Sequence, residues 1–366
     1  MSRAAAPVLV GLRPILVTGG AGFIGSNLAD RLAREGHHVL ILDSLARPGI
    51  ERNVEWLRAR HRERVTMVKA DIRDHGALRT VVTDAAAVFH FAAQVAVTTS
   101  FADPAEDFAV NAAGSFGLVE AVRLQKRSIP LVFASTNKVY GNLADVGLCL
   151  IEDAYLPTDP ELRAQGISEG WPIDFHTPYG CSKGTADQYV LDYARSFDLP
   201  MAVLRMSCIY GPRQMGNEDQ GWVAHFLIKA LCGEPIRIFG DGRQVRDILY
   251  VDDAVDAYLA AWRRIPKLKG RAFNLGGGTR NAVSLLALIA FIEERLGRRL
   301  TILHDDWRQG DQRYYVSDRR RAERELGLAE PVPWHIGVAR LIDWLQSERG
   351  ARPARTDESR QTEAVG

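Results

Sequence analysis

Short apolar runs alternate with amphipathic segments along the first half of the chain. Between the runs, apolar residues recur about every 3.6 residues, as along residues 24–32 and 108–122. A further helix is predicted over 179–197. Buried strands that alternate with helices are typical of right-handed βαβ units and a parallel sheet. The pattern therefore predicts an α/β domain whose strands lie at 15–17, 39–42, 65–68, 88–92, 131–134 and 201–204.

The pattern changes after residue 207, where Gly and Pro interrupt the chain more often. Helices are predicted there over 221–231, 253–262, 284–296 and 334–345. This favours a smaller, mostly helical second lobe built from several segments. We expect an N-terminal extension over 1–13, a first domain over 14–207, a lobe mainly over 208–348 with some segments returning to the first domain, and a disordered polar tail over 349–366.

A glycine-rich segment follows the first predicted strand and opens the first predicted helix. Residues 18–25 read Thr-Gly-Gly-Ala-Gly-Phe-Ile-Gly. Glycines let a backbone approach a pyrophosphate closely, and a helix N-terminus supplies N–H groups and a positive dipole. The alternative is a purely structural tight turn. We expect a dinucleotide cofactor to be bound by Gly19, Gly22, Phe23, Ile24 and Gly25.

Two acidic residues follow the second and third predicted strands. Asp43 stands 18 residues after Gly25. A carboxylate there accepts hydrogen bonds from ribose hydroxyls and repels a 2′-phosphate, which favours NAD over NADP. At Asp71-Ile72 a side chain and a backbone group can meet the adenine. Plain strand-end capping is the alternative at Asp71.

A tyrosine and a lysine four residues apart, Tyr179 and Lys183, share one face of the predicted helix. A nearby ammonium favours the phenolate and lowers the pKa of a tyrosine, so Tyr179 is a candidate general base. The fifth predicted strand leads into the hydroxyl pair Ser135-Thr136, which can hold a reacting oxygen. An exposed helix pair and ordinary strand-end capping are the structural alternatives.

Composition narrows the class of protein. Apolar residues make up 46% and charged residues 25% of 366 residues, and the formal net charge is +1. These values are typical of a globular chain and do not favour a nucleic-acid partner. The four cysteines lack disulfide or zinc spacing, and the histidines show no metal-ligand pattern, so we expect no metal. No apolar run is long enough to span a membrane, and we expect a cytoplasmic protein.

The glycine-rich loop, the Tyr-x-x-x-Lys pair and the alternating pattern resemble the extended short-chain dehydrogenase/reductases, in particular their nucleotide-sugar epimerases and dehydratases. The resemblance spans about residues 14–345. It implies a Rossmann-type doubly wound parallel sheet carrying a tightly bound NAD that each turnover regenerates. It also implies a C-terminal lobe for a nucleotide-diphosphate sugar and a homodimer or homotetramer. Asn111 would shape the active-site helix, and Ala92 and Ala93 would lie beside the nicotinamide ribose.

The residues after Thr136 separate the reactions within this family. A 4,6-dehydratase must remove a proton and expel water, and the dehydratases carry Asp-Glu at this point. This chain carries Asn137-Lys138. Neither side chain can replace a carboxylate pair in an elimination, whereas epimerisation needs no such pair. The sequence therefore disfavours dehydration.

Longer stretches, residues 91–100, 135–141, 176–189, 219–222 and 244–247, are similar to the epimerases that invert C2 of CDP-linked 3,6-dideoxyhexoses on the way to surface polysaccharide. The resemblance implies that Thr136, Tyr179 and Lys183 are catalytic. Another NAD-dependent epimerase, acting at C4 or on a UDP-, GDP- or dTDP-sugar, remains the main alternative. A non-catalytic NAD-binding protein is disfavoured because it has no need of these three residues.

The family pattern also implies substrate contacts. Arg246 and Arg308 would bind phosphate, and Asp311 would accept from the nucleotide ribose. Ordinary salt bridges and packing are the alternatives. The long segment 145–174 is expected to cover the sugar pocket. The remaining predicted substrate contacts are Gln94, Thr136, Asn137 and Gln220.

Overall fold

The computed structural model describes residues 13–350. Most of the extension predicted over 1–13 and of the tail predicted over 349–366 lies outside the described residues.

A seven-stranded sheet forms the centre of the larger lobe, and all its neighbouring strands are parallel. The predicted parallel sheet is therefore confirmed. The fourth strand ends at His90, two residues before its predicted end, because Phe91 and Ala92 turn across the glycine-rich loop. The order of the strands is β3 (Val65–Lys69), β2 (Val39–Asp43), β1 (Ile15–Thr18), β4 (Ala87–His90), β5 (Leu131–Thr136), β8 (Met201–Met206) and β12 (Arg271–Leu275).

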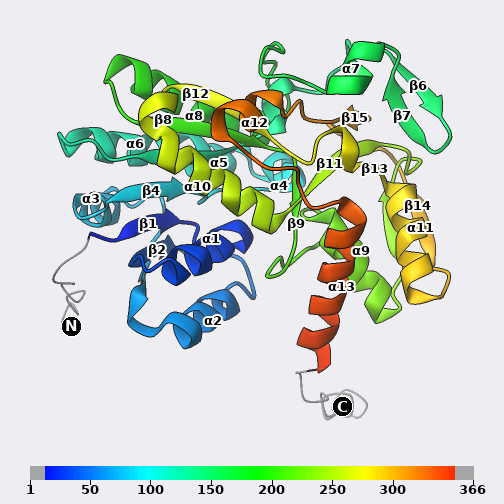
Figure 1. Ribbon diagram of the computed structural model, residues 1–366, viewed down its shortest axis with the longest axis horizontal. Coiled ribbons are helices and arrows are strands. Elements are labelled where there is room, and N and C mark those ends of the chain that lie inside the picture. Colours follow the sequence, from blue (N-terminus) through cyan, green and yellow to red (C-terminus); the bar gives the residue numbers. More distant parts are fainter. Residues whose placement is uncertain (1–12, 351–366) are drawn as a thin grey trace, which may run out of the picture.

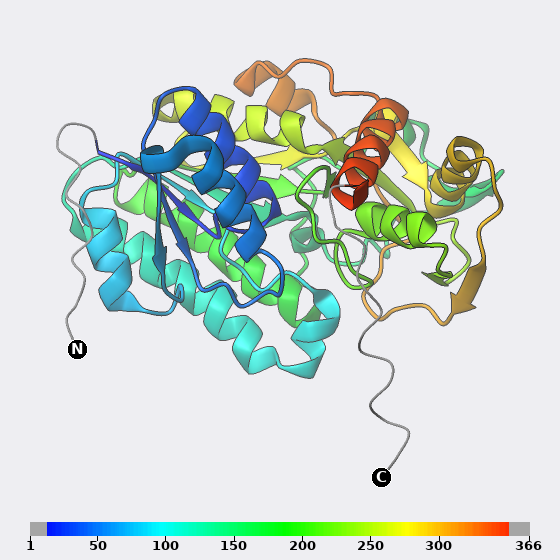
Figure 2. The same cartoon turned by 90° about the horizontal axis from the view of Figure 1, so that it is seen from below.

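Helices cover both faces of this sheet (Figure 2). One buried cluster joins the sheet to α1 (Phe23–Arg34), α2 (Glu51–His61), α10 (Val251–Leu268) and α12 (Arg320–Leu326). The other joins it to α3 (His75–Thr83), α6 (Gly114–Leu124) and α8 (Thr177–Ser196). The two clusters make the fold a Rossmann-type doubly wound sheet. A 3₁₀ turn, η1 (Arg62–Arg64), links α2 to β3.

Two segments beyond residue 207 belong to this lobe. Strand β12 is the sheet edge next to β8, and α10 packs against α1. The apolar residues of β12 and α10, such as Phe273 and Tyr258, lie in the buried cluster. Their burial explains why the chain returns to the first lobe (Figure 1).

The helix predicted over 108–122 is interrupted. The chain forms α4 (Val97–Ala102), α5 (Pro104–Phe108), a π-helical turn η2 (Ala109–Ala113) and then α6. Such π-helical turns are frequent at functional sites because they redirect side chains within a helix. Here the turn carries Asn111.

The second lobe contains two small sheets that the sequence did not predict, in addition to helices, which supply most of its regular structure as expected. Its strands are only two to six residues long and are separated by Gly and Pro, which hides them from periodicity arguments. They are β9 (Cys208–Tyr210), β10 (Ile236–Phe239), β11 (Val245–Tyr250), β13 (Ala282–Ser284), β14 (Ile302–Asp305) and β15 (Tyr314–Tyr315). The helices that pack on them are α9 (Trp222–Cys232), α11 (Leu285–Leu296) and α13 (Trp334–Gly350), with a 3₁₀ turn η4 (Thr279–Asn281).

The segment 145–174 is an ordered insertion. It forms a hairpin of β6 (Leu148–Ile151) and β7 (Ala154–Pro157), followed by α7 (Pro160–Gln165). The backbone N–H of Tyr155 donates to Arg243, and Ile167 pairs with Ser317. These contacts anchor the insertion to the small sheet around β11.

Candidate active site

The glycine-rich loop between β1 and α1 is shaped by close backbone contacts. Gly19 has φ of 69°, and a Cβ built there would lie 2.5 Å from the backbone nitrogen of Ala92. A Cβ on Gly25 would meet the carbonyl oxygen of Gly19. Gly22 caps α1, whose first residues are Phe23 and Ile24. The loop thus leaves backbone and a helix N-terminus where a pyrophosphate is expected, and it fits a dinucleotide.

Asp43 ends β2 beside this loop and is nearly buried. Its carboxylate accepts hydrogen bonds from the backbone N–H groups of Ala21, at 3.0 Å, and Leu45, at 2.9 Å. Burial raises the pKa of the Asp43 carboxyl, and these backbone bonds oppose that rise. The carboxylate therefore also braces the glycine-rich loop, a role that the sequence did not suggest.

The other predicted cofactor residues lie near this loop or along the same sheet edge. Ala92 and Ala93 follow β4, and the Ala92 N–H donates to Thr18 Oγ1 at 3.4 Å. Asp71 is half-exposed, and its carboxylate accepts from the side chain of Arg73 at 2.8 Å, which lowers its pKa. Ile72 is buried against Gly114 in α6. Arg73 therefore already binds the carboxylate expected to meet the adenine.

Tyr179 and Lys183 both lie in α8 and are both buried. The ammonium of Lys183 donates to the carbonyl oxygen of Ala134 at 2.7 Å and lies 4.3 Å from the ring centre of Phe133. Burial lowers the pKa of Lys183 to about 7, although the carboxylates of Asp187 and Asp107 oppose this.

Burial also raises the pKa of Tyr179 to about 12, against a hydrogen bond with Thr136 that lowers it. The expectation that Lys183 lowers this pKa is therefore wrong for the protein by itself. The physical reason is desolvation: α8 takes the phenol out of water, and the ammonium is directed at the Ala134 carbonyl rather than at the phenol.

Only one hydroxyl of the pair at the end of β5 faces Tyr179. Ser135 is buried and donates to Asp187 at 2.7 Å, whereas Thr136 Oγ1 accepts from the Lys138 N–H at 3.2 Å and hydrogen bonds with Tyr179. Successive strand residues point to opposite faces of a sheet, which explains the division. Thr136 is therefore the hydroxyl placed for chemistry.

A buried ion pair between Asp187 of α8 and Arg205 of β8 supports α8 and β5. Arg205 donates to both carboxylate oxygens of Asp187 at 2.9 Å, and also to the Tyr140 hydroxyl at 3.0 Å. Tyr140 in turn donates to Asn274 in β12 at 2.7 Å. This network was not predicted from the sequence. The one signal in the sequence was the position of Asp187, which stands four residues after Lys183 and so on the same helix face.

Asn111 joins the π-helical turn to α8. Its Nδ2 donates to Asp107 at 3.1 Å, to Ser182 at 3.2 Å and to the carbonyl of Gln94 at 3.0 Å. The Gln94 side chain also donates to Asp107 at 3.1 Å. Asn111 is thus placed to shape the active-site helix, while Gln94 belongs to this network.

A cavity of about 500 Å³ lies between α4, α9, β10 and the segment around residue 310. Apolar side chains such as Phe101, Trp222 and Phe239 form part of its wall. Gln94, Thr136 and Asn137 do not line it; Asn137 is buried and donates to Gln312 at 3.3 Å. Four predicted substrate residues do line it, namely Gln220, Arg246, Arg308 and Asp311.

These residues give the cavity charged walls. Arg246 donates to Asp311 at 2.6 Å, and Arg308 lies over the ring of Phe239 at 3.8 Å. Burial raises the pKa of Asp311, but Arg246 and Lys138 outweigh that effect and hold it below its ordinary value. Gln220 accepts from Arg47, a residue of the larger lobe. The cavity thus combines apolar walls with a few convergent charges, as ligand sites do.

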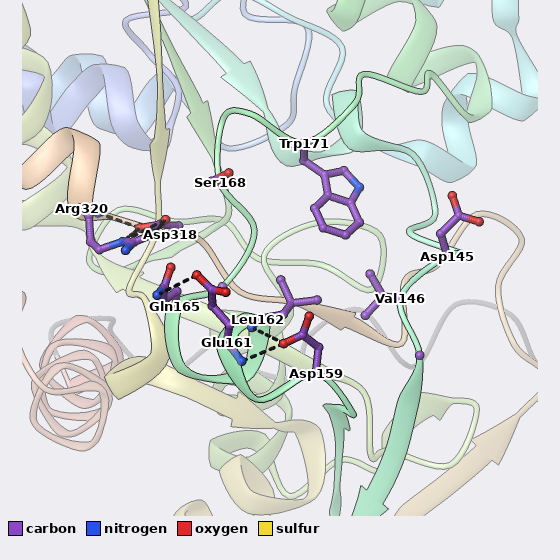
Figure 3. A pocket seen from close by; sticks show the side chains of 12 residues that line it. Asp145, Val146, Asp159, Glu161, Leu162, Gln165, Ser168, Trp171, Asp318 and Arg320 are labelled. Atoms are coloured by element: carbon purple, nitrogen blue, oxygen red, sulfur yellow. Dashed lines mark hydrogen bonds and ion pairs between the residues drawn. The ribbon is translucent and has the colours of Figure 1, made fainter.

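The insertion 145–174 does not cover this cavity, contrary to expectation, because its own contacts hold it against the β11 sheet. It lines a separate cavity of about 370 Å³, beside Asp318 and Arg320 (Figure 3). Asp159 there points at the first turn of α7, where it accepts from the N–H groups of Glu161 and Leu162. None of the predicted site residues lines this second cavity.

Residues 13–350 contain no group of three or more His, Cys, Asp and Glu side chains arranged to hold a metal ion. In that same range, every helix is too short or too polar to span a membrane.

A known family and known proteins resemble this chain over most of its length. Residues 15–276 match the NAD dependent epimerase/dehydratase family. A CDP-paratose 2-epimerase from Salmonella typhi is 38% identical over 340 residues, which are 91% of this chain and 99% of that protein.

Solved structures are also similar to this chain. A UDP-glucose 4-epimerase from Thermotoga maritima with UDP-glucose superposes with a TM-score of 0.79 at 30% identity, covering 92% of this chain and 99% of that one. A UDP-glucose 4-epimerase from Thermus thermophilus in complex with NAD has a TM-score of 0.77 at 30% identity, covering 93% and 100%. The chain therefore belongs to the NAD dependent epimerase/dehydratase family and is an NAD-dependent enzyme.

Proposed function

We propose that this enzyme inverts C2 of a CDP-activated deoxyhexose, as in the conversion of CDP-paratose to CDP-tyvelose. The observation that carries the proposal is the buried group of Thr136, Tyr179 and Lys183, followed by Asn137-Lys138 instead of a carboxylate pair. With NAD as hydride acceptor and donor, this group could serve the oxidation and reduction of a sugar carbon, but it lacks the acid and base that dehydration needs. The likeness to a CDP-paratose 2-epimerase supports the choice of base and carbon.

The residues divide the chemistry among them. NAD, when bound, supplies an acceptor and donor of hydride. Thr136 holds the sugar oxygen, and Tyr179 takes the proton from that hydroxyl and later returns it. Lys183, bound to the Ala134 carbonyl, holds α8 against β5 and so keeps Tyr179 beside Thr136. Inversion requires that the planar ketone turns its other face before the hydride returns to the carbon.

The cofactor would be held by the residues around the glycine-rich loop, with Asp43 on the adenosine ribose. The nucleotide sugar would occupy the cavity of about 500 Å³. Arg246 and Arg308 would bind the diphosphate, because a guanidinium donates to two phosphate oxygens at once. Asp311 would accept from the ribose, and Gln220, which lines the cavity, would lie near the sugar.

We also propose that the enzyme is a homodimer. Large side chains remain exposed on α5, α6 and α8, where Phe108, Phe116, Tyr189 and Phe197 have exposed fractions between 39% and 57%. Exposed apolar patches of this kind are typical of interfaces. A tetramer would need a second surface.

The expected location is the cytoplasm. Cys149, Cys181, Cys208 and Cys232 are all free thiols. Free thiols without disulfides are typical of a reducing compartment.

The decisive experiment follows CDP-paratose and CDP-tyvelose by NMR in D₂O, with purified enzyme and no added NAD. We expect interconversion without deuterium at C2, because the hydride returns to the carbon from which it left. Deuterium at C2 would contradict the mechanism. Failure with both sugars, by protein that carries NAD, would favour a different epimerase. UDP-, GDP- and dTDP-sugars would then be screened for inversion at C4.

A further inference from the structure

Lys138 is a largely buried cation whose role the residues assigned so far do not explain. It lies in the 3₁₀ turn η3 (Asn137–Tyr140), directly after the catalytic strand β5. Its side chain lines the cavity of about 500 Å³ and is only 18% exposed. A lysine at such a position is rare unless its charge has a partner.

The charges around Lys138 do not balance. Asp311 accepts from Arg246 at 2.6 Å and lies 4.0 Å from the Lys138 ammonium, so two cations share one carboxylate. The other arginines of the cavity have carboxylates of their own: Arg308 pairs with Asp219, and Arg237 with Asp305. A desolvated excess charge is unfavourable, so this corner of the cavity favours an added anion.

The Lys138 ammonium also has hydrogen-bonding capacity to offer. It carries three N–H donors. Within residues 13–350 its one hydrogen bond is a long one, 3.4 Å to the carbonyl oxygen of Gly310. The ammonium can therefore donate to a ligand without losing a strong partner.

The position of Lys138 along the site indicates which part of a ligand it meets. Its backbone N–H donates to Thr136 Oγ1 at 3.2 Å, so it follows the catalytic hydroxyl directly. Its ammonium points at Gly310 and Asp311, on the wall that carries Arg246 and Arg308. A ligand that reaches from Thr136 to Arg308 passes Lys138 between its reacting sugar and its nucleoside.

We propose that Lys138 binds the sugar-linked phosphate of the nucleotide-sugar substrate and thereby selects nucleoside diphosphates over monophosphates. This inference rests on the proposed function, since it takes the cavity as the nucleotide-sugar site. Lys138 is then a third cation beside Arg246 and Arg308, and it lies on the side of the reacting sugar.

The test is calorimetric titration of the NAD-containing enzyme with CDP and with CMP. The variants are Lys138→Gln, which removes the charge, and Lys138→Arg, which keeps it. Lys229→Gln is the matched control, because it removes a half-exposed lysine of α9 that does not line the cavity. We expect Lys138→Gln to weaken CDP binding about tenfold or more, as expected for a lost charge-assisted hydrogen bond, while CMP binding changes little. Lys138→Arg should restore part of the preference for CDP.

The outcomes separate this inference from the function on which it rests. If Lys138→Gln bound CDP as tightly as the wild type, or lost equal affinity for CDP and CMP, the proposed role of Lys138 would be overturned. The proposed function would be unaffected. Should the wild-type enzyme bind no nucleoside diphosphate, the proposed function would fail and this inference with it. A melting temperature and NAD content equal to wild type would show that Lys138→Gln is folded.

Discussion

The ammonium of Lys183 donates a hydrogen bond of 2.7 Å to the carbonyl oxygen of Ala134. Ala134 lies in β5, two residues before Thr136, and Lys183 lies in α8, four residues after Tyr179. This one contact therefore ties the helix that carries the candidate base to the strand that carries the candidate hydroxyl. Catalytic groups must keep their mutual position to within a fraction of an ångström, which gives the contact its importance.

Replacing Tyr179 by Phe should remove the acid–base group and leave its ring. We expect turnover to fall by a factor of about 10² or more, while NAD stays bound. Steady-state kinetics together with the bound NAD content checks this. Tyr189→Phe, an exposed position on the same helix, is the control and should keep wild-type activity. Near-normal turnover of Tyr179→Phe would remove Tyr179 from its assigned role.

Replacing Asp43 by Asn should separate its two roles. The amide keeps an oxygen that can accept from the backbone of the glycine-rich loop but loses the charge that repels a 2′-phosphate. We expect NAD affinity to fall about tenfold and the preference for NAD over NADP to shrink. Asp43→Ala, which also loses the bonds from Ala21 and Leu45, should bind both dinucleotides less well than Asp43→Asn. Unchanged selectivity would place the adenosine ribose elsewhere.

The stability of the protein should rise with pH above neutrality because of Lys183. Its pKa is about 7 in the folded protein, against an ordinary value of 10.5. Between these values the unfolded chain binds more protons than the folded one, so the free energy of unfolding increases with pH. Urea unfolding at pH 6, 7.5 and 9 measures this. Lys183→Met should flatten the rise; an identical slope in both proteins would contradict the burial of a titrating ammonium.

Removing the carboxylate of Asp187 should destabilise the fold strongly. Asp187→Ala leaves Arg205 buried without its partner, and breaking such a pair costs about 3–5 kcal/mol. The control is Asp192→Ala on the same helix, whose pair with Arg195 is exposed and should contribute about 0–1 kcal/mol. Denaturant unfolding compares the two. A similar loss in both variants would mean that the buried pair has no special role.

The proposed dimer predicts that charge on its apolar surface separates the subunits. Phe108→Glu places a carboxylate on the most exposed of the large apolar side chains there, at 57%. Light scattering after size exclusion should then give a monomer where the wild type gives a dimer. Ile336→Glu, an exposed apolar position on α13, should leave the dimer intact. A wild-type monomer, or dissociation by Ile336→Glu alone, would contradict the proposed interface.

The structural features that were predicted well are those that depend on residues close together in the sequence. The six predicted strands of the parallel sheet, the glycine-rich loop and the Tyr179–Lys183 face each depend on residues within a few positions of one another. Periodicity and short motifs report such relationships directly. Six of the seven strands of the sheet and the placement of Tyr179 and Lys183 on one helix followed from them, whereas the edge strand β12 did not.

The parts that were missed depend on distant contacts. The strands of the second lobe are short and become strands only by pairing with distant segments. Strand β11 pairs with residues 208–210, 282–284 and 314–315, and β10 pairs with β14. The insertion 145–174 is held by residues about 90 to 150 positions away, which no local pattern reveals.

The sequence by itself determined the fold class, the glycine-rich loop and the candidate acid–base pair, because neighbouring residues carry these features. Only the tertiary structure decided that Thr136 rather than Ser135 faces Tyr179, that Asp187 is paired with Arg205, and that burial raises the pKa of Tyr179. It also brought Lys138 to Asp311 across 173 positions of the chain. Desolvation and charge pairing are set by what surrounds a group in space, and the folded chain alone supplies those surroundings.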